Sequence, residues 1–269
     1  NKVVVADLRD RGAIFVEDID EIPDDSLVIF SAHGVSSAVE EETKTRNLNF
    51  FDATCPLVTK VHMEVKKHAK ASKDIILVGH EGHPEVEGTM GRHINSDNSS
   101  IYLVQNEFDA KNVRINNPTK LALVTQTTLS VDETKSIIHI LKHRFPDIDI
   151  PKKDDICYAT QNRQDAVKQL ALESDFMIVV GSKNSSNSNR LSELAEKCGC
   201  RSILIDEFTD IDLDDLKNYS KISITAGASA PESKVMEIAK SLELHTDAEI
   251  IEHGEDNEDI YFKLPPGLR

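Results

Sequence analysis

Two cysteines in this chain stand in settings that favour a reactive thiolate. Cys55 follows the run NFFDAT and Cys157 follows DDI, and a stretch with a helical pattern comes after each of them, at 58–71 and at 162–173. Backbone N–H groups and the dipole at a helix N-terminus lower the pKa of a thiol, and thiolates bind metal ions and iron–sulfur clusters. Two buried, small apolar residues are the alternative that spacing alone allows. The local setting that Cys55 and Cys157 share favours the interpretation that they are ligands of a metal ion or cluster.

The other two cysteines fit a structural role better. Cys198 and Cys200 flank Gly199, where the pattern predicts the C-terminus of a helix. That end of a helix disfavours a thiolate, and a CxC pair is a weak metal signature.

A second group of residues that could do chemistry lies in the segment GHEGHPEVEG (79–88). Its titratable side chains suit acid–base catalysis or metal binding, and they are His80, Glu81, His83, Glu85 and Glu87. Gly82 and Pro84 exclude an HExxH helix. A solvated acidic loop is the alternative. His33 has a similar place after a strand-like run, and a structural role is its alternative.

A third segment, GSKNSSNSNR (181–190), has the composition of an anion site. Seven of the ten residues from Ser182 to Leu191 are Ser or Asn, between a buried run and an amphipathic helix. Hydroxyls, amides and a helix N-terminus together bind anions without positive side chains. The segment 226–231, ahead of a predicted helix at 232–242, repeats this geometry. Ordinary helix capping would need only one such residue. The residues alone therefore indicate a phosphate-type ligand near thiolates and a protonatable loop.

The elements that position these residues follow one recurring pattern. A short apolar run ends in small polar residues and a helical stretch follows, which is typical of βαβ units with mostly parallel sheets. The ligand of such a sheet lies at the carboxyl ends of its strands. The runs are LVIFSAHGVS (27–36), NFFDATCP (49–56), IILVGHEGHPE (75–85), LALVTQTTLS (121–130), MIVVGSKNSSNSNR (177–190) and KISITAGASAPE (221–232).

The two cysteines also mark a longer repeat, because they lie about a hundred residues apart, one domain length. We expect three similar α/β domains of about four strands each. The first, at 1–54, is incomplete; the second spans 55–153 and the third 154–247. A tail at 248–269 is predicted to return to the core, with an edge strand at 260–264 that Pro265 ends.

Composition narrows the class of protein. The 269 residues include 31 Lys and Arg against 47 Asp and Glu, a net charge of −16, which opposes binding to nucleic acid or to an anionic membrane. The apolar runs are strand-sized, too short to cross a bilayer. Four cysteines are too few for a disulfide scaffold, so we expect a reducing compartment. The chain begins at Asn1 with a helical pattern that has no cap, so we expect upstream sequence, which leaves a targeting peptide open.

Seven strings in a fixed order resemble one family, the LytB (IspH) 4-hydroxy-3-methylbut-2-enyl diphosphate reductases. They run from residue 31 to 232, and RGAIFVE (11–17) extends the likeness. The strings are SAHGVS, DATCPLVTKVH, GHEGHPEVEGTMG, TQTTLS, DDICYATQNRQ, GSKNSSNSNRL and TAGASAPE.

The resemblance implies a trefoil-like arrangement of three α/β domains around a central cavity. Each domain would give one Cys to a 4Fe-4S cluster, and Cys55 and Cys157 match two of these ligands. The family's other cysteine ligand lies in a GFCAGV-type motif, which would fall upstream of Asn1. A His of the family would fall immediately before Asn1. A chain without that motif would assemble the cluster poorly.

The resemblance also implies the reaction and its residues. Two electrons, from a donor such as ferredoxin or flavodoxin, and protons would convert the allylic diphosphate to isopentenyl and dimethylallyl diphosphate at the end of the methylerythritol phosphate route. Glu85 and Thr127 match the family's proton relay. The substrate would be held by residues at matching positions, which are His33, His83, Thr127, Ser185, Ser186, Asn187 and Ser229.

Two rival hypotheses use the same residues differently. A phosphosugar-binding isomerase or transferase would use the Ser/Asn segments and bind no iron. A non-catalytic iron–sulfur sensor would account for the missing N-terminal ligand, but it would not need Glu85 and Thr127 as a proton relay.

Overall fold

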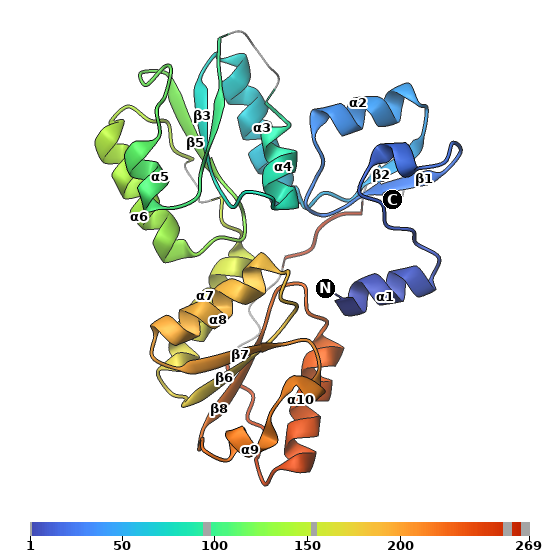
Figure 1. The fold of residues 1–269 in the computed structure, drawn as a ribbon, viewed down its shortest axis with the longest axis vertical. Helices are drawn as coiled ribbons and strands as arrows, with labels where there is room; N and C mark the ends of the chain where they lie inside the picture. Colours follow the sequence, from blue (N-terminus) through green and yellow to red (C-terminus); the bar gives the residue numbers. More distant parts are fainter. Residues whose placement is uncertain (1, 94–97, 152–154, 255–259, 265–269) are drawn as a thin grey trace. The chain divides into compact units, whose positions relative to one another are not determined.

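The structure, a computed structural model, describes residues 2–93, 98–151, 155–254 and 260–264 (Figure 1). The described chain is an α/β protein with three separate sheets, and every strand pair in them is parallel. This confirms the predicted fold class. Two compact units divide the chain: Val16–Cys157 with Ile260–Arg269, and Asn1–Phe15 with Tyr158–Asp259.

The unit that contains Val16–Cys157 holds two of the sheets. In the first, β1 (Leu27–Phe30) pairs with β2 (Asn49–Asp52). In the second, the strand order is β4-β3-β5, so that β3 is central. Its strands are β3 (Asp74–Val78), β4 (Ile101–Val104) and β5 (Leu121–Thr125). The helices of the unit are α2 (Ser37–Thr45), α3 (Pro56–Lys70), α4 (Pro84–Met90), α5 (Glu107–Asn112) and α6 (Val131–Arg144).

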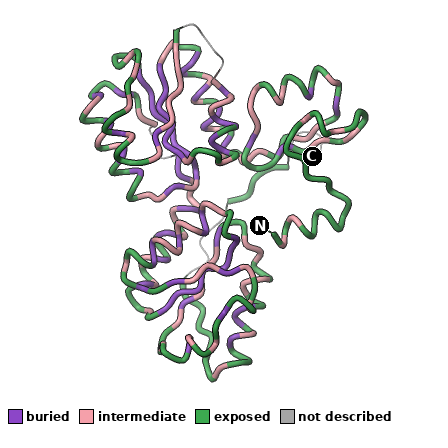
Figure 2. The backbone as a smooth tube through the Cα atoms, viewed as in Figure 1, coloured by how far each residue is buried: buried purple, intermediate pink, exposed green. Residues whose placement is uncertain are grey.

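Strand β3 shows why this sheet is buried on both faces. Successive side chains point to opposite faces of a strand. Ile75 and Leu77 pack with the core residues of α3 and α4, whereas Ile76 and Val78 pack with those of α5 and α6. Figure 2 shows the buried strands at the centre of this layered arrangement. An unbroken apolar run therefore forms this strand, and the polar residues after it are placed at the sheet edge.

The unit that contains Tyr158–Asp259 repeats this design. Its sheet has the order β7-β6-β8, formed by β6 (Phe176–Val180), β7 (Arg201–Ile205) and β8 (Ile222–Ala226). Met177 and Val179 pack with α7 and α8, and Phe176 and Ile178 pack with α10. The helices are α1 (Lys2–Asp10), α7 (Tyr158–Ala171), α8 (Ser186–Lys197), α9 (Leu213–Leu216) and α10 (Glu232–His245).

Two details of the prediction are wrong. The larger sheets have three strands each and the first has two among the described residues, not about four. The segment 260–264 is exposed and forms no strand, because alternation of apolar and polar residues creates a strand only where a sheet edge offers hydrogen bonds. Asp154, the predicted start of a domain, lies outside the described residues, and the three domain boundaries stay a prediction. Within the described residues, no helix is long and apolar enough to cross a membrane.

We expect Leu191→Ala, on the buried face of α8, to lower the free energy of unfolding by about 2–5 kcal/mol, because it leaves a cavity in place of a fully buried side chain. Urea titration followed by circular dichroism measures this change. Leu172→Ala is the matched control, since Leu172 is 83% exposed and its loss should change stability by less than about 0.5 kcal/mol. Equal effects of the two substitutions would contradict the packing described above.

Candidate active site

Glu85 and Thr127 meet at the carboxyl edge of the β4-β3-β5 sheet. Thr127 follows β5, and Glu85 lies in α4, which follows β3. The Thr127 backbone N–H donates to Glu85 Oε1 at 2.6 Å, and the Thr127 hydroxyl lies 3.0 Å from Oε2. Both residues are buried. The parallel strands end at one edge, so segments 42 residues apart in sequence form one hydrogen-bonded pair.

The environment of Glu85 prepares it to hold a proton near neutral pH. Burial raises the pKa of this carboxyl to about 7; the bonds from Thr127 oppose the shift, and the negative charge of Asp155 adds to it. A carboxyl of this kind can donate a proton at physiological pH.

His83 and His33 form a second pair on the same unit. His83 caps α4, where its Nδ1 accepts from the Glu85 backbone N–H at 3.2 Å. The two rings lie edge to face, with centroids 5.6 Å apart. Burial, together with the smaller effects of the neighbouring His33 and His80, lowers the pKa of His83 to about 4. His83 is therefore a neutral ring near pH 7 whose proton is on Nε2, a hydrogen-bond donor for a ligand.

Cys55 and Cys157 are half-buried, and neither forms a disulfide with a described residue. Cys55 is the N-cap of α3, and its N–H donates to Ala32 O at 3.0 Å. Cys157 directly precedes α7, and its N–H donates to Thr127 O at 3.0 Å. Both positions match the predicted setting. Among the described residues, no group of three or more His, Cys, Asp and Glu side chains is arranged to hold a metal ion.

The Ser/Asn segment begins α8 in the other unit. Ser185 is the N-cap, and its hydroxyl accepts from the Ser188 N–H. Asn187 is 4% exposed, yet neither polar atom of its amide has a partner within the described part of the chain. A buried amide without partners is costly unless a ligand satisfies it. Ser186 is half-buried at the start of α8, and Ser229 is exposed in the turn after β8.

Close packing leaves no room for side chains around this segment. A Cβ at Gly227 would lie 2.0 Å from Ser188 Oγ, and one at Gly181 would lie 2.3 Å from it. Both glycines directly follow strands of the same sheet. The backbone of these strand ends therefore approaches α8 closely, as an anion site built from small residues requires.

Two partly buried charge networks were not predicted from the sequence. The Lys60 ammonium donates to Asp155 Oδ1 at 2.9 Å. Arg92 Nε donates to His62 Nδ1 at 3.1 Å, and Arg92 also forms an ion pair with Glu40. The sequence offered one signal for these contacts. The strings that contain Cys55 and Cys157, DATCPLVTKVH and DDICYATQNRQ, also contain Lys60, His62 and Asp155.

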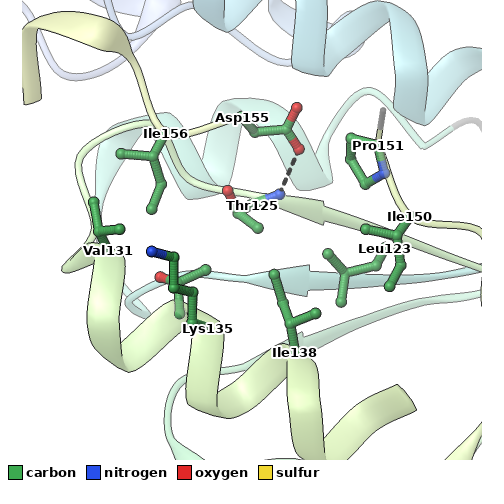
Figure 3. A pocket seen from close by; sticks show the side chains of 10 residues that line it. Leu123, Thr125, Val131, Lys135, Ile138, Ile150, Pro151, Asp155 and Ile156 are labelled. Atoms are coloured by element: carbon green, nitrogen blue, oxygen red, sulfur yellow. Dashed lines mark hydrogen bonds between the residues drawn. The ribbon is translucent and has the colours of Figure 1, made fainter. Parts of the chain in front are cut away.

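A cavity of about 30 Å³ lies beside β5 and α6, with Asp155 among its lining residues (Figure 3). Its other lining side chains are mostly apolar, including Leu123, Val131 and Ile138, and none of the predicted site residues lines it. It has room for no more than a few water molecules, so it is not the substrate site.

The α/β fold places half-buried thiols directly before two helices and a carboxyl at the buried carboxyl edge of a parallel sheet, a set of groups that suits an oxidoreductase. The sequence model of the LytB protein family matches residues 1–243. The chain belongs to this family, the 4-hydroxy-3-methylbut-2-enyl diphosphate reductases, which are oxidoreductases.

Individual relatives agree with this assignment. Reductases of that name from Alcanivorax borkumensis and Pseudomonas putida are 56% and 57% identical over 271 residues, covering 100% of this chain and 86% and 85% of the relatives. The solved structure of the E-1-hydroxy-2-methyl-but-2-enyl-4-diphosphate reductase from Plasmodium falciparum is 37% identical, with a TM-score of 0.92, over 98% of this chain and 83% of that one. A second solved reductase, described as the terminal enzyme of the non-mevalonate pathway, is 28% identical with a TM-score of 0.61, over 91% and 85%.

We expect Glu85 to make stability depend on pH in one direction. Its pKa is about 7 in the folded protein against 4.5 in the unfolded chain, so the bound proton stabilises the folded state fully below about pH 4.5. This contribution is lost as the pH rises to about 7, a decrease of about 3 kcal/mol. Urea unfolding at pH 4.5, 6 and 8 gives the free energy of unfolding of the wild type and of Glu85→Gln. The difference between the two proteins at each pH measures the contribution of the Glu85 proton. A difference that stays constant over this range would disprove the raised pKa.

Proposed function

We propose that this chain removes the allylic hydroxyl of 4-hydroxy-3-methylbut-2-enyl diphosphate by reduction, with Glu85 and Thr127 as the proton source. One observation carries the proposal: Thr127 joins the buried carboxyl of Glu85 to the backbone of Cys157. A candidate proton donor and a candidate ligand for a redox group are thus hydrogen-bonded to the same residue. The family membership supports the same reaction.

A 4Fe-4S cluster is the redox group that suits this chain. Cys55 and Cys157 fit it chemically, because cysteine sulfur is the usual ligand of such clusters and both residues are half-buried, directly before helices of 15 and 14 residues. A third thiolate is expected from a Cys-bearing segment upstream of residue 1. The bound cluster would supply electrons and an iron with an open coordination position. A donor such as ferredoxin or flavodoxin would reduce it.

Neutral donors would hold the diphosphate. His83 offers Nε2–H because its Nδ1 is already bonded to the Glu85 backbone, and His33 lies beside it. The buried amide of Asn187 has polar atoms to offer, and the serines would add hydroxyl groups at the start of α8 and after β8. Neutral donors suit a protein of net charge −16, in which local hydrogen bonds must replace a positive field. The serines concerned are Ser185, Ser186 and Ser229.

The residues of this chain would supply the proton for the departing oxygen. The reaction consumes two electrons and two protons. When the C–O bond breaks, the oxygen leaves as water with a proton from Glu85 through the Thr127 hydroxyl, and Glu85 becomes a carboxylate. The second proton adds to carbon and gives isopentenyl or dimethylallyl diphosphate. Burial of Glu85 keeps its proton available until this step. The bacterial relatives, and cysteines that form no disulfide among the described residues, support a place in the bacterial cytoplasm.

Iron binding tests the cluster. We expect an extended chain, carrying a Cys-bearing segment upstream of residue 1, to bind iron and sulfide after anaerobic reconstitution and to show the broad visible absorption of an iron–sulfur protein. Cys55→Ser and Cys157→Ser should abolish this absorption, because each removes one thiolate. Cys198→Ser, a matched control at the end of α8, should leave it unchanged. If the extended chain holds no iron, the phosphosugar-binding alternative becomes the better explanation.

Steady-state kinetics tests the proton source. We expect Glu85→Gln to lower kcat about a hundredfold or more with little change in KM, because the amide cannot donate the proton. In the wild type, kcat should fall as the pH rises above about 7, since Glu85 then loses its proton. Glu87→Gln is the control, an exposed carboxyl in the same helix. A kcat near that of the wild type in Glu85→Gln would exclude Glu85 as the donor.

A further inference from the structure

Asp155 attaches the segment that ends at Cys157 to strand β5 through a hydrogen bond. Its side chain has no exposed surface, and Oδ2 accepts from the Thr125 N–H at 3.0 Å, the bond drawn in Figure 3. Two residues later, the Cys157 N–H donates to Thr127 O. The segment is therefore attached to the end of β5 at two points, one through a side chain and one through the backbone.

Lys60 connects the same carboxylate to α3. Its ammonium lies 2.9 Å from Asp155 Oδ1, so that Asp155 bonds a strand with one oxygen and a helix with the other. Lys60 is five residues after Cys55, the N-cap of α3. The helix and the segment that carry the two thiols are thus joined by one ion pair.

Stability alone does not explain this pair. An ion pair with one fully buried partner loses so much hydration that two apolar side chains would stabilise the fold as well or better. Glu64, one turn after Lys60 in α3, adds another acidic group 3.9 Å from the same ammonium. Burial and then the charge of Asp155 raise the pKa of Glu64. Charges held in this way specify a geometry, since their bonds form only at one separation of the two elements.

We propose that Lys60 and Asp155 are positioning residues for the two thiolates, and that their ion pair fixes the helix that begins at Cys55 relative to the segment that ends at Cys157. This inference rests on the proposed function, because it concerns iron–sulfur ligands. It assigns no contact with iron or substrate to either residue.

The test uses three variants of the extended chain and one control. Lys60→Met and Asp155→Asn remove the ion pair, although the Asn can still accept from Thr125. Lys60→Arg keeps the charge. Lys70→Met is the control, an exposed lysine at the other end of α3. Hydrogen exchange of the Cys157 amide in the iron-free protein reports the attachment, and the rate of iron loss to a chelator, with the electron paramagnetic resonance spectrum of the reduced protein, reports the ligand geometry.

We expect Lys60→Met and Asp155→Asn to speed exchange at Cys157 and iron loss by about tenfold each and to change the resonance spectrum, because each substitution removes the ion pair between α3 and the segment of Cys157. Lys60→Arg should restore both rates to within about twofold, and Lys70→Met should change neither. Faster exchange with unchanged iron loss and spectrum would overturn the proposal and leave the pair a purely structural role. Unchanged exchange would overturn it as well. If the unaltered extended chain binds no iron, the proposed function itself fails, which the wild-type sample shows separately.

Discussion

The buried carboxyl of Glu85 is the constraint on which the rest of the site depends. A carboxyl that is 3% exposed is tolerated only because the N–H and hydroxyl of Thr127 saturate it. Those two donors are in place only while β3 and β5 keep their parallel register, in which Val78 faces Thr125. A slip of one residue would turn the strand faces over and leave the carboxyl without partners. The register of the sheet and the chemistry of the site therefore select the same arrangement.

Helix α3, which is fifteen residues long, contacts several parts of the candidate site. Its first turn begins at Cys55, Lys60 contacts the segment of Cys157, and His62 lies against Gly34, where a Cβ would come within 2.5 Å of the imidazole. Gly34 has φ of +77°, a conformation that other residues rarely adopt, and it directly follows His33. One helix thus sets the surroundings of both thiols and of a histidine at the candidate diphosphate site.

The sequence predicted the helices and strands well where one strong local pattern determined them. Apolar runs such as 75–78 are buried on both faces, and parallel strands follow from their spacing with helices. Glu85 and Thr127 were singled out by type and by resemblance, but their bond depends on which strand ends adjoin, and the strand order β4-β3-β5 is a tertiary property. Lys60 and Asp155 were missed because a lysine on a helix is usually solvated, and its partner lies 95 residues away. The strand predicted at 260–264 was wrong for the opposite reason. Its local pattern was suitable, but among the described residues no sheet edge was there to pair with it.

The hydrogen bond at His83 Nδ1 also has a thermodynamic consequence. Because the pKa of the free ring is about 4, the protein carries almost no charge there near pH 7. The Glu85 N–H occupies Nδ1, the nitrogen that would take the extra proton, so a bound anion accepts from the Nε2–H of a neutral ring. Binding and release at His83 therefore exchange almost no proton with the solvent near pH 7. The heat of association should then have no contribution from His83 protonation, and buffers with different ionisation enthalpies would give the same heat from this ring.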